Sequence, residues 1–323
     1  MSTVTVFGGS GFIGRHAVRA LANAGHRVRV AVRSPNLANF LLPAGHVGQI
    51  QVVKCNVRNA EQVAAALRGA DAAVNLVGVL YSRGNQSFNA LHAEAAGTIA
   101  KAAKEAGIET LVHISTPGIS TESECVYSRT KAEGEIALRD AFPEATILRP
   151  SLVFGPEDNF FNKFGNLARY VPALPLIGGG HTQFQPVFVG DVAAAILKCV
   201  SDPGTHGKTY ELGGPAVYSF KEILETILRV TERKRLLVPV PFWMASIQAF
   251  FLQFLPEPLL TPDQVTFLKT SNLVADNALT FKDLGIVPDS MEAVLPSYLW
   301  RFRSRGQYED YAREKIIAAP EPR

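Results

Sequence analysis

Three glycines spaced three residues apart, Gly8, Gly11 and Gly14, follow the short apolar run Thr3–Phe7. In such a turn the first glycine permits a sharp bend off a strand, the second lets backbone amides approach a phosphate, and the third lets the next helix pack closely. The unpaired N–H groups and the dipole of that helix favour an anion. Because a strand precedes the turn and a helix follows it, the pattern predicts a dinucleotide pyrophosphate site. Its further contacts are expected from Ser10, Phe12, Ile13 and Arg15.

The second predicted strand ends at Val32 and is followed by Arg33 and Ser34. A site for NAD usually carries Asp or Glu at this point, to bind the ribose 2′-hydroxyl. A guanidinium and a hydroxyl suit a 2′-phosphate instead, and Arg15 would add a second cation. We therefore expect NADPH or NADP rather than NAD. The alternative is that Arg33 is only a surface residue at a strand end.

The ends of the third and fourth predicted strands supply further candidates. Asn56 and Val57 are placed to offer a side-chain amide and an apolar contact beside an adenine. Leu76 closes the fourth strand, and Gly78 permits close backbone approach to a cofactor. These four positions follow from topology rather than from a specific motif, and ordinary loop chemistry is the alternative for each.

Tyr127 and Lys131 lie four residues apart, so on a helix they share one face. A cation beside a phenol favours the phenolate and lowers its pKa, which would let Tyr127 act as a general acid or base on a carbonyl/alcohol pair. Lys131 is also placed to hydrogen-bond a nicotinamide ribose, and Ser115 or Thr116 to bind a substrate oxygen. The spacing is frequent by chance, so a purely structural pair is the alternative. Its place after the fifth strand favours contact with the cofactor more than it favours turnover.

Alternating strands and helices must position these residues. Several of the strand runs are apolar for most of their length, as parallel strands covered on both faces must be. The repeated β-α-β order predicts an α/β fold, a Rossmann-type doubly wound parallel sheet with a smaller mixed α/β C-terminal lobe. The expected strands are Thr3–Phe7, Arg27–Arg33, Ile50–Cys55, Ala72–Val77, Thr110–Ser115 and Ala145–Leu148, and the expected helices are Gly11–Ala24, Ala60–Leu67, Ala90–Ala106 and Glu124–Asp140.

The periodic pattern loosens after Pro150. We place an NADP-binding Rossmann domain at residues 1–150 and a substrate or docking lobe at residues 151–323, leaving open that the chain re-enters the sheet. Residues 300–315 are charged and aromatic, and we expect a solvated helix with a frayed end there.

Composition excludes several classes of protein. With 32 basic and 29 acidic residues the net charge is +3, so charge gives no reason to expect a nucleic-acid partner. Three scattered cysteines make no disulfide framework, and the seven histidines show no metal-ligand spacing, so no metal is expected. The first strand begins at about residue 3, which leaves no room for a leader ahead of it. A bacterial cytoplasmic protein, or an already processed one, is expected.

The stretch Leu236–Pro256 passes twenty-one residues without a formal charge. Pro239 and Pro241 interrupt its start, which leaves a helix of at most about fourteen residues from Phe242, too short to span a bilayer. One interpretation is that the stretch packs inside the C-terminal lobe. The other is an interfacial helix, Phe242–Leu255, that meets a membrane or a membrane-embedded partner.

Four features of the sequence together resemble the extended or atypical branch of the short-chain dehydrogenase/reductase superfamily. They are the glycine turn, the Tyr127/Lys131 pair, the run from Leu148 to Pro156 and the run from Phe188 to Ala193. The resemblance implies that Pro150 contacts the cofactor. In that branch Asp191 is expected to be a helix N-cap rather than a catalytic acid. One departure stands out, because only eleven residues separate Ser115 from Tyr127, where the enzymes usually carry a longer loop with part of the substrate pocket.

Four further segments resemble the family of dehydrogenase-like accessory subunits of respiratory complex I and their bacterial relatives. That resemblance implies a tightly held, structural NADPH bound by Gly8, Gly11, Gly14, Arg33, Tyr127 and Lys131. It also implies complex I subunits as partners, and a place on the cytoplasmic face of a bacterial inner membrane. The segments are Asp140–Ala145, Gly155–Asn162, Gln185–Val189 and Lys282–Ile286.

Two functions are consistent with this sequence. The first is an NADPH-binding accessory or assembly subunit of complex I, whose cofactor is mainly structural. The second is an NADP-dependent oxidoreductase or epimerase, with Tyr127 as acid/base, Lys131 as the residue that tunes it and Ser115 or Thr116 as the substrate-orienting hydroxyl. The intact Tyr/Lys pair favours the enzyme, and the shortened loop argues against it.

Overall fold

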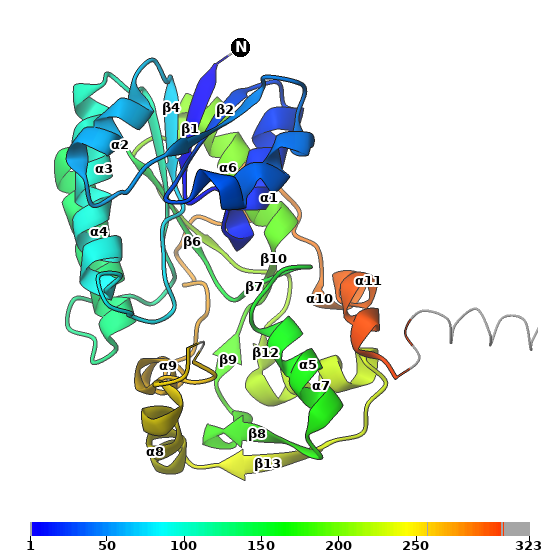
Figure 1. Cartoon of the computed structure of the whole chain (residues 1–323). Helices are drawn as coiled ribbons and strands as arrows, with labels where there is room; N and C mark the ends of the chain where they lie inside the picture. The colour runs from blue at the N-terminus through cyan, green and yellow to red at the C-terminus, as the bar shows by residue number, and fades with distance from the viewer. Residues whose placement is uncertain (1, 257, 305, 307–323) are drawn as a thin grey trace, which may run out of the picture.

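The computed structural model describes residues 2–256, 258–304 and 306. A parallel sheet of seven strands forms the upper half of the molecule, and a smaller lobe lies below the carboxyl ends of its strands (Figure 1). The sheet has the order β11-β6-β5-β4-β1-β2-β3, the doubly wound order with its reversal beside β1. Its strands are β1 (Thr3–Phe7), β2 (Arg27–Val32), β3 (Ile50–Lys54), β4 (Ala72–Asn75), β5 (Thr110–Ile114), β6 (Thr146–Pro150) and β11 (Thr209–Leu212).

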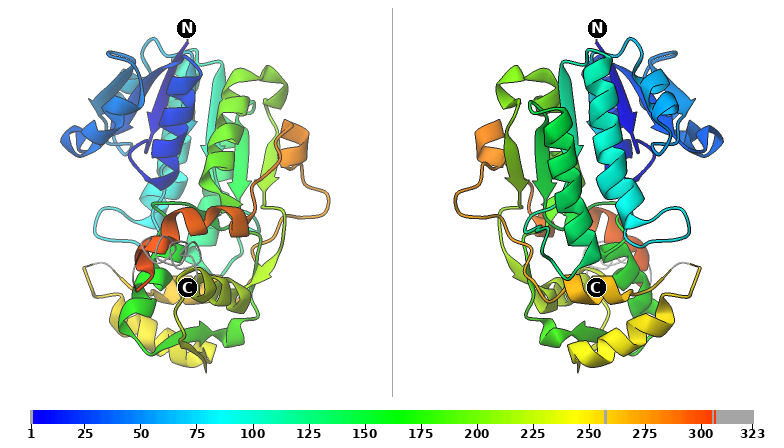
Figure 2. Two further views of the ribbon diagram at one scale, coloured as in Figure 1. Left: turned by 90° about the vertical axis from the view of Figure 1, so that its right-hand side faces the viewer. Right: turned by 90° about the vertical axis from the view of Figure 1, so that its left-hand side faces the viewer.

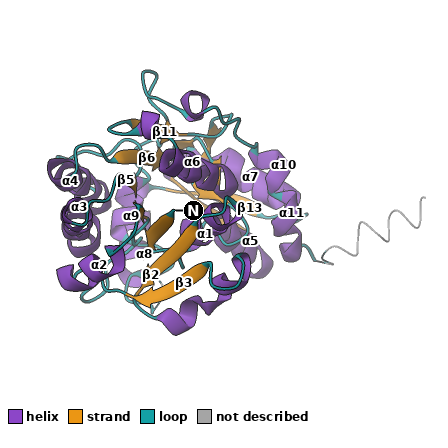
Figure 3. Cartoon of the chain, turned by 90° about the horizontal axis from the view of Figure 1, so that it is seen from above, coloured by secondary structure: helices purple, strands orange, loops and turns teal. Residues whose placement is uncertain are grey.

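Helices cover both faces of this sheet (Figure 3). On one face lie α1 and α6, and on the other α2, α3 and α4, so the central strands are buried on both sides and apolar for that reason. The bounds are α1 (Phe12–Asn23), α2 (Ala60–Leu67), α3 (Ala95–Glu105), α4 (Val126–Ala141) and α6 (Val189–Ser201). A π-helical segment, Asn89–Glu94, leads directly into α3, and a 3-10 segment, Pro35–Ala44, follows β2.

The predicted fold class and the six predicted strands of the first half are confirmed, with ends that differ by a few residues. The seventh strand comes from much later in the chain, since β11 pairs with β6 and α6 packs beside α1. The division at residue 150 stays a prediction, although this sheet takes a strand and a helix from beyond it.

The lower lobe contains both strands and helices and has its own hydrophobic core, separate from the cores on the two faces of the sheet. It contains three two-stranded pairs, two of them parallel and one antiparallel. The pairs are β7 (Val153–Phe154) with β10 (Val187–Phe188), β9 (Gln183–Phe184) with β12 (Tyr218–Ser219), and β8 (Ala173–Ile177) with β13 (Leu236–Val240). The helices are α5 (Phe161–Tyr170), α7 (Phe220–Val230), α8 (Phe242–Leu252), α9 (Pro262–Phe267), α10 (Met291–Val294) and α11 (Pro296–Leu299).

Two expectations about the second half are wrong. Asp191 is not the N-cap of α6: Phe188 holds that position, and Asp191 lies in the first turn, where its Oδ2 accepts a hydrogen bond from the Asp289 amide at 2.8 Å. The tail does not begin as a solvated helix, because Trp300–Phe302 form a 3-10 turn and Phe302 is buried in the lower core beside Gly165. Residues 307–323 lie outside the described residues.

Candidate nucleotide-binding site

The glycine turn joins β1 to α1 at the carboxyl edge of the sheet. Gly8 has a φ of +76°, and a Cβ there would lie 3.0 Å from the Leu76 carbonyl. A Cβ on Gly14 would lie 2.4 Å from the Gly8 oxygen, so no side chain fits where the helix closes on the turn. Gly11 is the N-cap of α1, and its amide donates to the Gly8 oxygen at 3.0 Å. The first and third glycines are therefore required by the backbone itself.

The N-terminus of α1 is open to an anion. No side chain caps it, and its first turn contains no acidic residue. The first amides of the helix consequently keep their donors for a ligand. Around this turn Ser10, Phe12 and Ile13 are half-buried, and the Phe12 ring packs edge-on against His16 with the ring centroids 6.0 Å apart.

The two candidate cations differ in their surroundings. The Arg15 guanidinium stacks over the Phe40 ring at 4.9 Å and lies 3.9 Å from a Glu157 carboxylate oxygen of the lower lobe. Arg33 is exposed after the end of β2, beside the exposed Ser34, and makes no ion pair with any described residue. The positive charge of Arg33 is therefore uncompensated within the described part of the chain.

At the end of β3, Asn56 and Val57 already have structural contacts. The Asn56 amide donates to Gln62 Oε1 at 2.8 Å, and its Oδ1 accepts from the Arg58 amide at 3.2 Å. Val57 is buried in the core between the sheet and α2. Their expected contact with the adenine stays a prediction.

At the end of β4 the chain runs between the glycine turn and α4. The Leu76 amide donates to the Phe7 oxygen at 3.0 Å, and its carbonyl lies against Gly8. A Cβ on Gly78 would lie 3.6 Å from Lys131 Nζ and 3.8 Å from His92 Nε2. The fold thus brings Gly78 and Lys131 together from separate parts of the sequence.

Tyr127 is held among aromatic rings. Its ring packs edge-on against Phe88, His92 and Phe267, with centroid distances of 5.9, 5.2 and 5.7 Å. Burial, followed by the charges of Cys125 and Asp263, raises the pKa of Tyr127 to about 12. The expectation that Lys131 lowers the pKa of Tyr127 is wrong, because the loss of water around the phenol dominates.

Lys131 follows Tyr127 by one turn of α4 and is buried. Its Nζ donates to the Ile114 carbonyl at 3.1 Å. Burial lowers the pKa of Lys131 to about 8, and Glu135 opposes part of that shift. Its bond to a nicotinamide ribose stays a prediction, and two of its ammonium hydrogens remain to make one.

The remaining predicted residues lie at the ends of β5 and β6. Ser115 is buried, and its Oγ has no hydrogen-bond partner among the described residues. Thr116 Oγ1 instead accepts from Asn272 Nδ2 at 3.4 Å. Pro150 is the last residue of β6 and is buried opposite Leu212 of β11. A buried hydroxyl without a partner is costly, so Ser115 is the residue of this group that best fits contact with a ligand.

Sequence reasoning missed two buried histidines near Lys131. His92 Nε2 accepts from the Val79 amide at 3.1 Å, and burial lowers the pKa of His92 to about 2. His113 Nδ1 lies 3.0 Å from Asn75 Nδ2, its Nε2 has no partner among the described residues, and burial lowers its pKa to about 3. Both are therefore neutral. No local spacing links them to Lys131, because the sheet brings them there.

These residues fit a dinucleotide. Doubly wound sheets bind nucleotides at the carboxyl ends of their central strands. Four features lie there in this protein: the uncapped N-terminus of α1, the glycine turn, the Arg33 charge and the Ser115 hydroxyl without a partner among the described residues. A nicotinamide dinucleotide, when bound, would supply hydride-transfer chemistry. Among the described residues no group of three or more His, Cys, Asp or Glu side chains is arranged to hold a metal ion.

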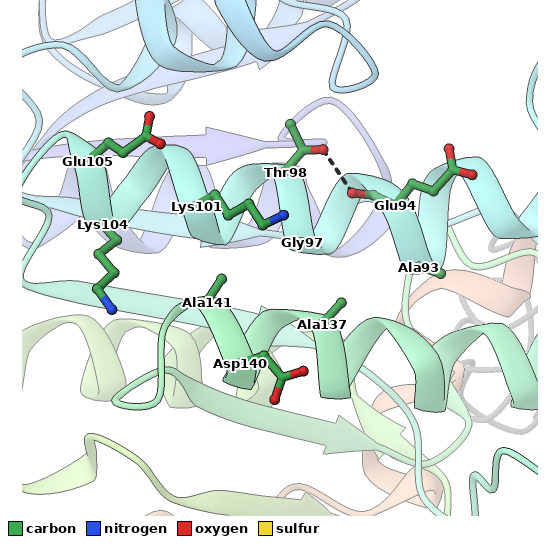
Figure 4. Close-up of a pocket in the computed structure, with 10 residues that line it drawn as sticks. All are labelled: Ala93, Glu94, Gly97, Thr98, Lys101, Lys104, Glu105, Ala137, Asp140 and Ala141. Carbon is green, nitrogen blue, oxygen red and sulfur yellow. Dashed lines mark hydrogen bonds between the residues drawn. The ribbon is translucent and has the colours of Figure 1, made fainter.

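A separate groove of about 560 Å³ runs between α3 and α4 (Figure 4). Small residues such as Gly97 and Ala137 form its floor, and charged side chains such as Lys101 and Asp140 stand along it. None of the predicted nucleotide contacts lines this groove, so it is distinct from the site above.

The uncharged stretch lies at the far end of the lower lobe. Only Ala245 and Ala249 of α8 are buried, whereas Trp243, Phe251 and Phe254 are 65%, 68% and 74% exposed. The interpretation that this stretch packs inside the lobe is therefore wrong for these three rings. It holds for the start of the stretch, where Val240 is buried in the lower core and Leu237 and Phe242 pack against it. No helix in the described residues is long and apolar enough to cross a membrane.

Comparisons with known proteins agree with the fold. Residues 4–213 match the NAD dependent epimerase/dehydratase family. The chain is 38% identical to the mitochondrial NADH dehydrogenase [ubiquinone] 1 alpha subcomplex subunit 9 of Arabidopsis thaliana, over 97% of this chain and 81% of that protein. It is 32% identical to the mitochondrial NADH-ubiquinone oxidoreductase 40 kDa subunit of Neurospora crassa, over 95% of this chain and 81% of that one.

Among solved structures, the fold is similar to that of a dTDP-glucose 4,6-dehydratase from Streptomyces venezuelae with NAD and TYD bound. The TM-score is 0.71 at 21% identity, and the match covers 96% of this chain and 98% of that one. At this identity the likeness establishes the shared fold alone.

Proposed function

The chain belongs to the NAD dependent epimerase/dehydratase family and, within it, to the family of these complex I subunits; from that premise we propose that it is an NADPH-binding accessory or assembly subunit of respiratory complex I, NADH:quinone oxidoreductase. Its cofactor is mainly structural. It acts as a peripheral protein on the cytoplasmic face of a bacterial inner membrane.

The observation that carries the proposal is the exposure of α8. Large apolar side chains that face water cost free energy and mark an interaction surface when they are contiguous. Trp243, Ile247, Phe250 and Phe251 of α8, with Phe254 just after it, form such a surface, which we call the α8 face. A cation lies at the C-terminal end of this face, since Arg83 donates to the Pro256 carbonyl two residues after Phe254. An apolar face with a cation at its edge suits the anionic surface of a membrane and the subunits embedded there.

The preference for NADPH rests on Arg33. An exposed guanidinium without an ion-pair partner in the described chain is a ready donor to a ribose 2′-phosphate. Aspartate or glutamate, which would favour the NAD ribose, is absent from this strand end.

The structural role of the nucleotide rests on the surroundings of Tyr127. A phenol with a pKa of about 12, enclosed by three rings, is a poor acid/base near neutral pH. A bound nucleotide needs no turnover to be useful, because ligand at 100 times its dissociation constant adds about 2.7 kcal/mol of stability.

A second candidate function, an NADP-dependent oxidoreductase or epimerase, is favoured by one observation. The buried Ser115 hydroxyl without a partner lies at the end of β5, where it would orient a substrate oxygen. Steady oxidation of NADPH by the isolated protein with a carbonyl substrate would establish this function over the first.

Mild solubilisation of membranes tests the docking proposal. We expect the protein to migrate with NADH:quinone oxidoreductase activity, and the double variant Phe250→Ser/Phe254→Ser to be released while NADPH binding is retained. Val287→Ser is the matched control, because Val287 is an exposed apolar residue far along the chain from α8. A wild-type protein that never migrates with the complex, or a double variant that stays attached, would overturn the proposal.

A further inference from the structure

The helix that carries Tyr127 and Lys131 does not cap its own N-terminus. Cys125 is its N-cap residue but makes no side-chain capping bond, and the first turn of α4 contains no acidic residue. The first amides of a helix need acceptors, and leaving them buried without one is costly.

Asp263 supplies those acceptors, although it lies 137 positions after Val126 in the chain. Its Oδ1 accepts from the Val126 amide at 2.6 Å, and its Oδ2 accepts from the Tyr127 amide at 3.0 Å. The Cys125 thiol donates to the same Oδ2 at 3.4 Å. A carboxylate at this position also meets the positive end of the α4 dipole.

Asp263 is itself held in place by α9. This helix begins with a capping box, in which Thr261 and Gln264 bond each other's backbone amides, and with Pro262 in its first turn. Asp263 therefore lies at the N-terminus of α9 and faces the N-terminus of α4, so one carboxylate meets two helix dipoles. One turn later Phe267 packs on the Tyr127 ring, so α9 contacts both the backbone and the side chain of that residue.

The α8 face is attached to α9 on its other side. In the right-hand view of Figure 2, α9 (orange) lies beneath the lower end of α4 (green), and α8 (yellow) lies below α9. Ala245 and Ala249, the buried residues of α8, belong to the same core as Val265 of α9. Gln264 Nε2 also donates to the Leu80 carbonyl at 3.4 Å, which ties α9 to the segment that follows Gly78.

We propose that Asp263 is a positioning residue that joins the α8 face to the helix bearing Tyr127 and Lys131, so that nucleotide binding and occupancy of the α8 face strengthen each other. The inference rests on the proposed function, because it needs both a nucleotide and a docking surface. Coupling of this kind is reciprocal: whatever orders α9 on α4 favours both ligands. The short path from Lys131 to the α8 face, through Asp263 and one helix, gives the coupling a defined physical element.

Three variants of the full chain test this inference. Asp263→Ala removes both acceptors, Asp263→Asn keeps one acceptor oxygen without the charge, and Glu222→Ala removes a carboxylate that caps only its own helix, α7. For each protein we would measure the dissociation constants of NADPH and NADH, the thermal midpoint, and amide hydrogen exchange of residues 242–252 and 262–267 with and without NADPH.

In the wild type we expect NADPH to slow exchange in both segments, because ordering of α4 is transmitted through Asp263. In Asp263→Ala the affinity for NADPH should fall at least tenfold, and the protection of residues 242–252 by saturating NADPH should disappear. Asp263→Asn should recover part of both effects. Glu222→Ala should lower the thermal midpoint without changing either.

The possible failures are distinguishable. A wild type that binds neither nucleotide would overturn the proposed function and this inference together. If the wild type binds NADPH but Asp263→Ala keeps both its affinity and its protection of α8, the inference alone is overturned. Equal effects of Glu222→Ala and Asp263→Ala would show that Asp263 only stabilises the fold, which also overturns it.

Discussion

The glycine turn and the N-terminus of α4 are two helix starts at the same edge of the sheet, built in opposite ways. The α1 start uses seven consecutive residues, Gly8 to Gly14, and leaves its amides uncapped. The α4 start depends on residues from two distant segments, since Asp263 and Phe267 of α9 cap the helix and pack on Tyr127, and Phe88 packs on the same ring. One helix start is open to an anion, and the other is already occupied by one.

This difference gives the two helix starts different capacities for binding an anion and for ionising a side chain. An open helix N-terminus favours phosphate, whereas a capped one next to a half-buried phenol among three rings offers neither an anion site nor a readily ionised group. The region that looks most like an enzyme in the sequence is therefore the one in which the fold suppresses ionisation. Four variants test this contrast.

The largest effect is expected from Gly14→Val, at the locally built start. A Cβ there overlaps the Gly8 oxygen at 2.4 Å, so we expect a loss of at least about 3 kcal/mol in the free energy of unfolding and no nucleotide binding. Urea unfolding measures the first and NADPH titration the second. Gly11→Ala, whose Cβ would lie 3.2 Å from the same oxygen, is the control and should cost about 1 kcal/mol or less. Equal losses would show that the turn is not sterically limited at Gly14.

Lys131→Met tests the buried start through its dependence on pH. Burial lowers the pKa of Lys131 from 10.5 to about 8, so between these values the unfolded chain binds more protons than the folded one. The wild type should therefore gain about 2 kcal/mol of stability relative to Lys131→Met as the pH rises from 7 to 10, and lose it as the pH falls. Unfolding curves across this range, with the exposed Lys104→Met as control, measure the difference. Parallel curves for Lys131→Met and the wild type would contradict the burial of the charge.

Arg33→Asp tests the open start by its choice of nucleotide. Loss of the guanidinium and gain of a carboxylate should weaken NADPH binding at least tenfold, about 1.4 kcal/mol, and leave NADH binding equal or stronger. Arg15→Met should weaken NADPH less, because Glu157 already shares the Arg15 charge. Isothermal titration with both nucleotides gives the ratio, and an unchanged ratio for Arg33→Asp would remove the assignment to NADPH.

The smallest effect is expected from Phe267→Ala. Opening the aromatic enclosure readmits water, so the pKa of Tyr127 should fall from about 12 toward its ordinary value of 10. Ultraviolet difference titration of the phenolate, with Tyr127→Phe as the blank, measures it. Phe250→Ala removes an exposed ring of α8 and should leave the titration unchanged. A Tyr127 that titrates alike in Phe267→Ala and wild type would mean that Phe267 contributes nothing to the enclosure.

The same contrast explains how far the sequence could be interpreted alone. Strands β1 to β6 and the glycine turn are encoded by runs of adjacent residues, so periodicity and spacing predict them. The place of Gly78 at the carboxyl edge of the sheet could be inferred from strand order. The rise in the pKa of Tyr127 could not, because its causes include Asp263 and the Phe267 ring, whose approach no local pattern encodes. Asp191 is misassigned for another reason, because α6 begins at Val189, three residues earlier than an N-cap at Asp191 requires.

Helix α6 and strand β11 complete the sheet layer although they lie after residue 188, and this order affects folding during synthesis. The core on one face of the sheet includes Val192 and Ile196 of α6 and Leu212 of β11, together with Val4 and Leu21 from the first two elements. The chain must therefore be synthesised beyond residue 212 before that face is covered. Contacts of such long sequence separation form slowly, and the unfinished sheet exposes an apolar surface and an unpaired β6 edge. We expect the nascent first half to depend on chaperones until the second half emerges.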